Sequence, residues 1–222
     1  MPSLAIIIPA AGSSSRFGRN KLLEPLDGKP VFRHTVEAFA RRTDLAGIFV
    51  PTSTSQLAQM TEGMPVTYCP GGTCRAQSVL NALRLIPAAV EWVAVHDAAR
   101  PLVSAGLIER TFSAAVAHGA AVPAMPVQLT IKQAAGPLPA RVQRTLPRHE
   151  LWAMQTPQVM RRQALLDAFD QCPIPLEQVT DDVQLLELSG QEIWLIPGEE
   201  QNLKITTPTD LLLAQQYLSN SP

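Results

Sequence analysis

The sequence predicts an α/β fold with a mostly parallel sheet, helices on both faces and a protruding β-hairpin arm. Short apolar runs and amphipathic stretches alternate four times between residues 4 and 124, which is typical of parallel strands joined by helices. Residues 127–148 replace this order by a two-residue alternation, which is typical of a hairpin. A chain of 222 residues can bury one core, so we expect a single domain over 1–222.

The first predicted strand, Leu4–Ile8, is a continuous apolar run that ends at Pro9, as expected for a strand buried on both faces. The next element is a helix with apolar residues at helical spacing from Val31 to Phe39. By the same criteria we expect strands at 47–50, 66–69, 92–95 and 120–124, and helices at 56–60, 76–83 and 104–117. Ligands of such sheets bind beyond the carboxyl ends of the strands, so the loops after the first, third and fourth strands are where we expect a site.

In the arm, Val127, Leu129 and Ile131 alternate with polar residues, Ala134–Pro137 can turn the chain, and 142–146 alternates again. A two-stranded ribbon is marginal alone, and an exposed one invites pairing with another chain. We therefore expect residues 127–148 to be the dimerisation arm of a homodimer. Beyond the arm, the patterns predict helices at 161–169, 181–188 and 208–218 and strands at 193–196 and 203–206.

Composition excludes several classes of function. The 18 Lys and Arg residues balance 19 Asp and Glu residues, so we expect no nucleic-acid or membrane partner. The three cysteines lack paired metal-ligand spacing, and the apolar N-terminal run is too short for a signal peptide or a membrane span. We expect a cytoplasmic protein.

The loop after the first strand is rich in small residues. Ala10, Ala11 and Gly12 allow a close approach of the backbone to a phosphate, and Arg16 and Lys21 add positive charge. The loop has neither the Walker A spacing nor the dinucleotide-binding spacing of glycines. The alternative is a flexible connection with solvated cations.

A second glycine turn, Pro70–Ser78, enters a helix after the third strand and contains Gly72 and Ser78. Free N–H groups at a helix N-terminus favour anions or the polar edge of a base. We expect the backbone of this turn to select cytosine. The alternative is an ordinary turn with Thr73 as the helix cap.

The third loop, His96–Pro101, follows the fourth strand. Asp97 at the end of a central strand is well placed to hold Mg²⁺, and Arg100 could orient its carboxylate. The alternative is a structural ion pair between Asp97 and Arg100. We interpret His96 as a packed or hydrogen-bonding histidine and not as a metal ligand.

The remaining candidates are less distinctive. Arg148 and Lys204, each taken alone, are typical of solvated charges, and Thr180–Asp182 predicts a capped, acidic helix start. The sequence offers no serine or cysteine nucleophile with a base, and no cysteine–histidine zinc spacing.

Taken in order, these motifs resemble the 2-C-methyl-D-erythritol 4-phosphate cytidylyltransferase family. The resemblance covers nearly the whole chain, through the loop with Arg16 and Lys21, Gly71–Ser78, His96–Pro101, Gln155–Gln158, Thr180–Asp182 and Asn202–Thr206. The third and fourth of these segments are the specific ones, because many nucleotidyltransferases share the first loop. Gly18–Leu23 departs from the family pattern: it lacks a proline before the lysine and resembles the molybdenum-cofactor nucleotidyltransferases.

The resemblance implies a Rossmann-like nucleotidyltransferase domain, Mg²⁺ and a homodimer whose arms embrace the neighbouring subunit. It implies a reaction of CTP with 2-C-methyl-D-erythritol 4-phosphate in the non-mevalonate isoprenoid pathway. By motif, Arg16 and Lys21 resemble the pair that stabilises the transition state, Gly72 and Ser78 the cytosine and ribose contacts, and Asp97 the acidic residue at the metal. Thr130, Arg148 and Lys204 resemble the groups that hold the acceptor, the first two reaching across from the partner's arm.

Two alternatives remain at this stage. One is a nucleotidyltransferase with another acceptor, such as molybdopterin or a sugar 1-phosphate. The other is a non-catalytic nucleotide-binding module, which would have no use for cations on the acceptor side.

Overall fold

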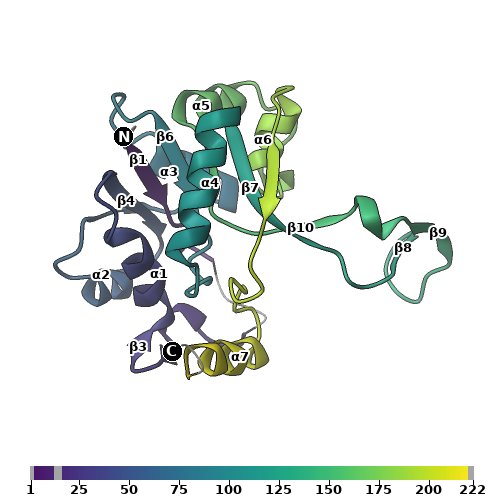
Figure 1. Ribbon diagram of the computed structural model, residues 1–222, viewed down its shortest axis with the longest axis horizontal. Coiled ribbons are helices and arrows are strands. Elements are labelled where there is room, and N and C mark those ends of the chain that lie inside the picture. The colour runs from purple at the N-terminus through teal and green to yellow at the C-terminus, as the bar shows by residue number, and fades with distance from the viewer. Residues whose placement is uncertain (1–2, 13–16, 220–222) are drawn as a thin grey trace.

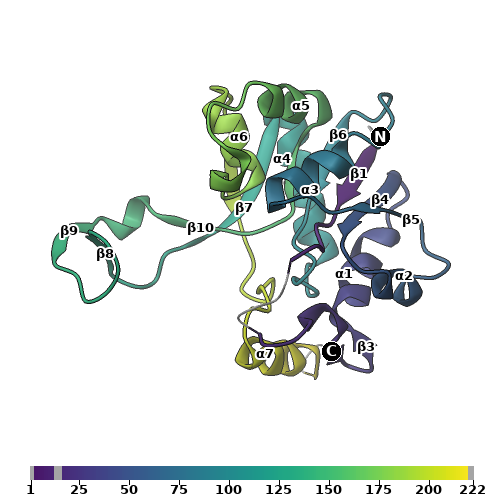
Figure 2. The same ribbon diagram turned by 180° about the vertical axis from the view of Figure 1, so that it is seen from behind.

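A computed structural model describes residues 3–12 and 17–219, and Figures 1 and 2 show it from two sides. Within these residues, an eight-stranded sheet has the order β10-β7-β11-β6-β1-β4-β5, with β12 paired to β7. Its strands are β1 Leu4–Ile7, β4 Leu45–Thr52, β5 Val66–Pro70, β6 Trp92–Val95, β7 Ala120–Pro126, β10 Trp152–Met154, β11 Gln158–Arg161 and β12 Trp194–Pro197. The pairs β6-β1, β1-β4, β4-β5 and β12-β7 are parallel, whereas β10 and β11 run antiparallel to their neighbours.

Helices cover both faces of the sheet because its inner strands are apolar on both sides. In β1, Leu4 and Ile6 join one hydrophobic cluster, and Ala5 and Ile7 join the other. The first cluster packs against α1 (Val31–Ala40), α2 (Gln56–Met60), α4 (Ala105–His118) and α7 (Pro208–Ser219), and the second against α3 (Arg75–Leu83), α5 (Arg162–Asp170) and α6 (Asp182–Leu188). The predicted fold class, including the continuous burial of the first strand, is confirmed.

The second half of the chain differs from the prediction in three places. Strands β10 and β11, on either side of Gln155–Pro157, were not predicted. The strand predicted at 203–206 is wrong. Its backbone lies outside the sheet, where the Ile205 amide donates to the carbonyl of Ala99 at 2.8 Å. The predicted strand at the start of the arm is also misplaced, because β7 continues to Pro126 and pairs with β10.

The arm is a two-stranded ribbon of β8 (Ile131–Ala134) and β9 (Val142–Leu146), with Ile131 opposite Leu146. Figures 1 and 2 agree that it stands clear of the body of the molecule. Leu129 and Leu138 are 76% and 86% exposed, so their apolar surface has no cover within the chain. No helix in 3–12 and 17–219 is both long and apolar enough to cross a bilayer.

The short elements of the N-terminal half complete the fold. A 3₁₀ turn (Lys21–Leu23) and a small ribbon of β2 (Pro25–Leu26) and β3 (Lys29–Pro30) connect the first loop to α1. Two further 3₁₀ turns, Arg148–Glu150 and Leu176–Gln178, follow the arm and α5. Because β1, β5 and β6 lie in one parallel array, the three loops expected to form a site end at the same edge of the sheet.

Candidate active site

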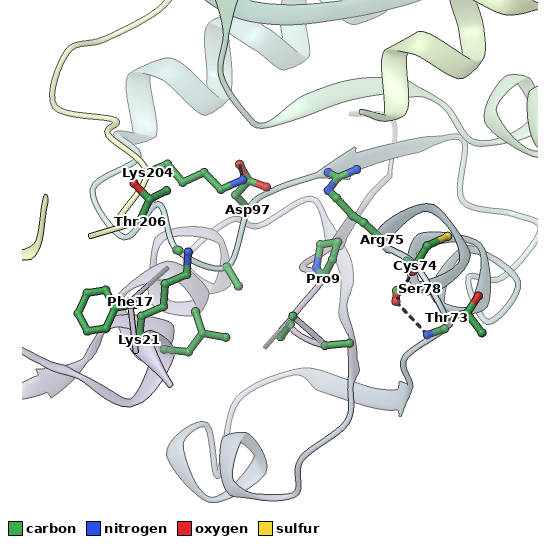
Figure 3. Close-up of a pocket in the computed structure, with 17 residues that line it drawn as sticks. Pro9, Phe17, Lys21, Thr73, Cys74, Arg75, Ser78, Asp97, Lys204 and Thr206 are labelled. Atoms are coloured by element: carbon green, nitrogen blue, oxygen red, sulfur yellow. Dashed lines mark hydrogen bonds and ion pairs between the residues drawn. The ribbon is translucent and has the colours of Figure 1, made fainter. Parts of the chain in front are cut away.

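A cavity of about 520 Å³ lies at this edge of the sheet (Figure 3). Four segments line it, namely the first loop with the following 3₁₀ turn, the glycine turn entering α3, the loop after β6, and the segment before α7. Of the residues predicted from sequence, the cavity brings together Ala10, Ala11, Gly12, Lys21, Gly72, Ser78, Asp97 and Lys204. Arg16, also predicted here, lies outside the described residues.

Lys21 reaches the cavity despite the short segment before it. The side chain of Asn20 caps the 3₁₀ turn by accepting from the Leu22 amide at 3.2 Å, and Leu22 is buried in the core. This fixes the direction of Lys21, whose Nζ donates to the carbonyl of Ile205 at 2.7 Å. Arg19, the other cation of this segment, pairs with Glu24 at 2.5 Å. The departure from the family pattern therefore does not prevent the delivery of Lys21.

Asp97 carries negative charge in a cationic environment. Lys204 Nζ lies 3.0 Å and Arg100 Nε 3.2 Å from the same oxygen, Asp97 Oδ2. Burial alone would raise the pKa of this carboxyl, but Lys204 and Arg100 outweigh burial and hold the pKa well below its usual value. In Figure 3 the Asp97 carboxylate lies between the side chains of Lys204 and Arg75.

Arg100 lies behind this carboxylate and is not among the residues that line the cavity. Besides Asp97, its guanidinium donates to the carbonyls of Asn202 at 2.7 Å and Met154 at 3.4 Å. Its donors are therefore engaged within the chain. The position fits a residue that orients Asp97 better than one that touches a ligand.

The glycine turn is tight because its atoms pack against both the first loop and α3. A Cβ atom on Gly71 would lie 2.5 Å from Ala11 Cβ, and one on Gly72 would lie 2.8 Å from the backbone carbon of Gln77. The Gly72 amide donates to Ser78 Oγ at 2.9 Å, and Ser78 Oγ donates to the carbonyl of Cys74 at 2.9 Å. Cys74, and not Thr73, caps α3.

Arg75 and Asp182 were not predicted as site residues. Arg75 lines the cavity, and its Nη2 pairs with the buried carboxylate of Asp182 at 2.7 Å. Burial raises the pKa of the Asp182 carboxyl. The nearby Arg75 acts in the opposite direction, but burial has the larger effect. These two residues are 107 positions apart in the sequence, so no local pattern predicts their contact. The predicted acidic helix start is confirmed, since Asp181 accepts from the Gln184 amide at 3.1 Å and α6 begins at Asp182.

Thr130 and Arg148 do not approach the cavity of their own chain. Both are exposed on the arm, and Arg148 Nη1 donates to the carbonyl of Gln128 at 2.8 Å. Neither residue lines the cavity, and the arm with β8 and β9 stands clear of the body of the molecule (Figure 1).

The site has few ligands for a divalent cation. Across the described parts of the chain, no three His, Cys, Asp or Glu side chains gather as a metal cage. Asp97 is the one carboxylate among the described residues that line the cavity, and both of its cationic partners contact Oδ2. Mg²⁺ commonly binds one or two carboxylates together with substrate phosphates and water. The donor set thus fits Mg²⁺ that arrives with a polyphosphate.

Comparison with known proteins decides which polyphosphate chemistry this is. The model of the 2-C-methyl-D-erythritol 4-phosphate cytidylyltransferase family matches residues 4–220. The chain belongs to this family. The cytidylyltransferases of Gloeobacter violaceus and Synechococcus elongatus are each 40% identical to it, over 96% of this chain and 95% of the relative. A bifunctional IspD/IspF enzyme of Desulfotalea psychrophila is 39% identical, and the matched part is 57% of that longer protein.

Solved structures of the same family share the fold. The cytidylyltransferase of Francisella tularensis superposes with a TM-score of 0.85 at 32% identity, over 96% of this chain and 99% of that one. That of Thermus thermophilus gives a TM-score of 0.81 at 32% identity, over 99% and 100%. The chain is thus a nucleotidyltransferase that joins CTP and 2-C-methyl-D-erythritol 4-phosphate, in isoprenoid biosynthesis. The non-catalytic module and the alternative acceptors are excluded.

Proposed function

We propose that this cavity promotes in-line attack of the acceptor phosphate on the α-phosphorus of CTP, with Lys21 and Lys204 as its catalytic cations. The observation that carries the proposal is the convergence of these lysines from the two ends of the chain. Lys21 bonds to the carbonyl of Ile205, the residue next to Lys204, and both lysines line the cavity. We assign Arg16 to the same triphosphate side on the strength of its motif.

The reaction needs positive charge more than it needs a base. The acceptor phosphate is already an anion at neutral pH, so no proton must be removed before it attacks. Charge develops on the non-bridging oxygens of the α-phosphate, and fixed cations there stabilise the transition state by about 2–4 kcal/mol each. Asp97 is unsuited to act as a base, because Lys204 and Arg100 already stabilise its ionised form.

Asp97 would hold Mg²⁺ that enters with CTP. The bound metal ion would neutralise the triphosphate and help pyrophosphate to leave. Lys204 contacts the same carboxylate, so the metal and this lysine are held in one small region. Ala10, Ala11 and Gly12 allow the triphosphate to approach the backbone of the first loop.

The glycine turn would select the base. The Gly72 amide is engaged with Ser78 Oγ, so the base would be read by other groups of this turn, its carbonyl oxygens among them. A carbonyl can accept from the exocyclic amine of cytosine, whereas uracil would present an oxygen at that point. Such a contact would favour CTP over UTP.

The acceptor side would be completed by a second subunit in a homodimer. Thr130 and Arg148 do not line the cavity of their own chain, and the arm presents the exposed side chains of Leu129 and Leu138. We assign the arm, residues 127–148, to dimerisation and Arg148 to the acceptor phosphate in the partner's cavity. We place the enzyme in the cytoplasm, since none of its three cysteines is in a disulfide.

One assay tests the proposal directly. The enzyme is incubated with 2-C-methyl-D-erythritol 4-phosphate and each of the four nucleoside triphosphates, with Mg²⁺ or with EDTA, and pyrophosphate release is followed. We expect rapid release only with CTP and Mg²⁺, and its loss in Lys21→Ala and Lys204→Ala. Lys29→Ala is the matched control, because Lys29 pairs with Glu37 outside the cavity. Equal turnover with ATP, or full activity of both cavity variants, would contradict the proposal.

A further inference from the structure

Two buried polar residues behind the cavity have no part in the chemistry proposed above. His96 is completely buried, and Thr156 is 5% exposed. They come from two segments that lie far apart in the sequence, His96–Pro101 and Gln155–Gln158. In the fold, β11 pairs with β6, and this pairing brings the two segments together.

The hydrogen bonds of these residues form a chain that ends on Asp97. The Asp97 amide lies 3.0 Å from Thr156 Oγ1, and Thr156 Oγ1 lies 3.0 Å from His96 Nδ1. His96 Nε2 lies 3.1 Å from the carbonyl of Arg100. Arg100 then returns to Asp97 through its amide, at 3.0 Å from the Asp97 carbonyl, and through its guanidinium.

The direction of each bond follows from what the atoms can do. A carbonyl can only accept, so His96 Nε2 carries a proton and donates to Arg100. A neutral imidazole has one such proton, so Nδ1 is an acceptor and the Thr156 hydroxyl donates to it. The hydroxyl oxygen then turns a lone pair to the Asp97 amide, which can only donate. One arrangement therefore satisfies every group.

We infer that Thr156 is a positioning residue for Asp97, and that His96 acts through it by fixing the direction of the Thr156 hydroxyl. The same peptide also supports the acceptor side of the cavity. Asn202, two residues before Lys204, is buried and donates through Nδ2 to the Thr156 carbonyl at 2.8 Å. Thr156 thus joins the loop of Asp97 to the segment of Lys204. This inference rests on the role proposed for Asp97.

The first test removes the hydroxyl and keeps the shape of the side chain. We expect Thr156→Val to lower kcat by about 10- to 100-fold, as changes behind a metal-binding residue commonly do, and to raise the Mg²⁺ concentration for half-maximal activity. The KM for CTP should change little, because Thr156 does not line the cavity. Thr156→Ser keeps the hydroxyl and should recover most of the loss.

The matched control is Thr111→Val. Thr111 is also completely buried and donates its hydroxyl to one carbonyl, that of Leu107, in helix α4. Both valine variants should lower the midpoint of thermal unfolding, but only Thr156→Val should change kcat and the Mg²⁺ requirement. Equal kinetic effects in the two variants would show that Thr156 is merely structural.

A double-mutant cycle with Asp97→Asn separates this inference from the proposed function. If Thr156 acts through Asp97, Thr156→Val should cost little further activity once Asp97 is changed. Full activity of Asp97→Asn would overturn the role of Asp97 itself. A large effect of Asp97→Asn, with an independent and multiplicative effect of Thr156→Val, would overturn the positioning role alone.

Substitutions of His96 provide a second route should Thr156→Val fail to fold. In His96→Asn the amide oxygen can take the place of the Nδ1 acceptor, whereas in His96→Gln the amide nitrogen can take the place of the Nε2 donor. We expect the asparagine variant to retain more kcat, because only it can orient the Thr156 hydroxyl. The opposite ranking would contradict the inference.

Discussion

The loop that carries Asp97 and the arm that carries Arg148 support their polar side chains in opposite ways. Around Asp97, the buried Arg100 and the partly exposed Lys204 pair with the carboxylate, and the buried hydroxyl of Thr156 accepts from the Asp97 amide. In the arm, Lys132 contacts Thr145 at 2.6 Å, Arg144 contacts Gln133 at 2.7 Å, and Arg148 contacts Gln128, all of them exposed. The loop of Asp97 is held by contacts with the rest of the fold, whereas the polar contacts of the arm are made within the arm.

This contrast has an energetic consequence. Leaving a buried polar group without its partner costs about 1–3 kcal/mol, whereas an exposed pair is worth about 0–1 kcal/mol. Substitutions beside Asp97 should therefore change stability and catalysis together. Substitutions in the arm should leave the stability of the fold almost unchanged and act only through a neighbouring subunit.

The largest effect is expected in the cavity, from Lys21→Ala. A cation aimed at charge that grows only in the transition state acts on the chemical step, so kcat should fall by about 10²–10³-fold while CTP binding weakens far less. Steady-state kinetics together with CTP titration would separate the two effects. Turnover within a few-fold of the parent would assign the role to another cation.

The arm should give a smaller effect of a different kind. Arg148→Ala should raise the KM for 2-C-methyl-D-erythritol 4-phosphate by about 10- to 100-fold, the value of a charge-assisted hydrogen bond, and leave the KM for CTP unchanged. Arg148→Lys should recover only part of the loss, because guanidinium can bind phosphate through two parallel bonds and ammonium cannot. An equal rise in both KM values would contradict an acceptor-specific role.

Lowering the pH should destabilise the buried region around Asp97 through His96. Burial lowers the pKa of His96 from 6.5 to about 4. At a pH between the ordinary pKa of 6.5 and the folded-state pKa of about 4, His96 is protonated in the unfolded chain but not in the folded chain. The stabilisation is therefore complete above pH 6.5 and is lost as the pH falls towards 4. From pH 7 to pH 5 the free energy of unfolding should drop by about 2 kcal/mol.

Urea denaturation of two variants checks this prediction. His96→Asn should remove most of the pH dependence, whereas His149→Asn should leave it unchanged, because His149 lies exposed after the arm with 78% of its side chain accessible. The same slope in the His96 variant and in the parent would contradict a buried, neutral histidine.

The smallest effect is expected from Arg144→Ala on the ribbon. Loss of its exposed contact with Gln133 should change the free energy of unfolding by less than about 0.5 kcal/mol at pH 7. A loss above about 2 kcal/mol in the same urea assay would show that the arm is supported by the body of its own chain.

Sequence patterns anticipated the regions that local physics determines. Continuous apolar runs located β1 and β6, and the loops after them supplied Lys21 and Asp97 to one cavity. Contacts between distant segments left no such signal. The pairing of Arg75 with Asp182 depends on how α3 and α6 pack, and the support of Asp97 by Thr156 depends on the antiparallel strand β11. Neither can be derived from spacing along the chain.

A mixing experiment tests most directly whether one site is built from two chains. Arg148→Ala and Lys21→Ala are each prepared alone, inactive under acceptor-limited conditions, and then mixed under conditions where affinity tags prove subunit exchange. In a heterodimer, one of the two sites would carry both lesions and the other would carry neither. With random exchange, the mixture should recover about a quarter of the parental activity. Proven exchange without any recovery would contradict the shared site and leave Arg148 as a surface charge.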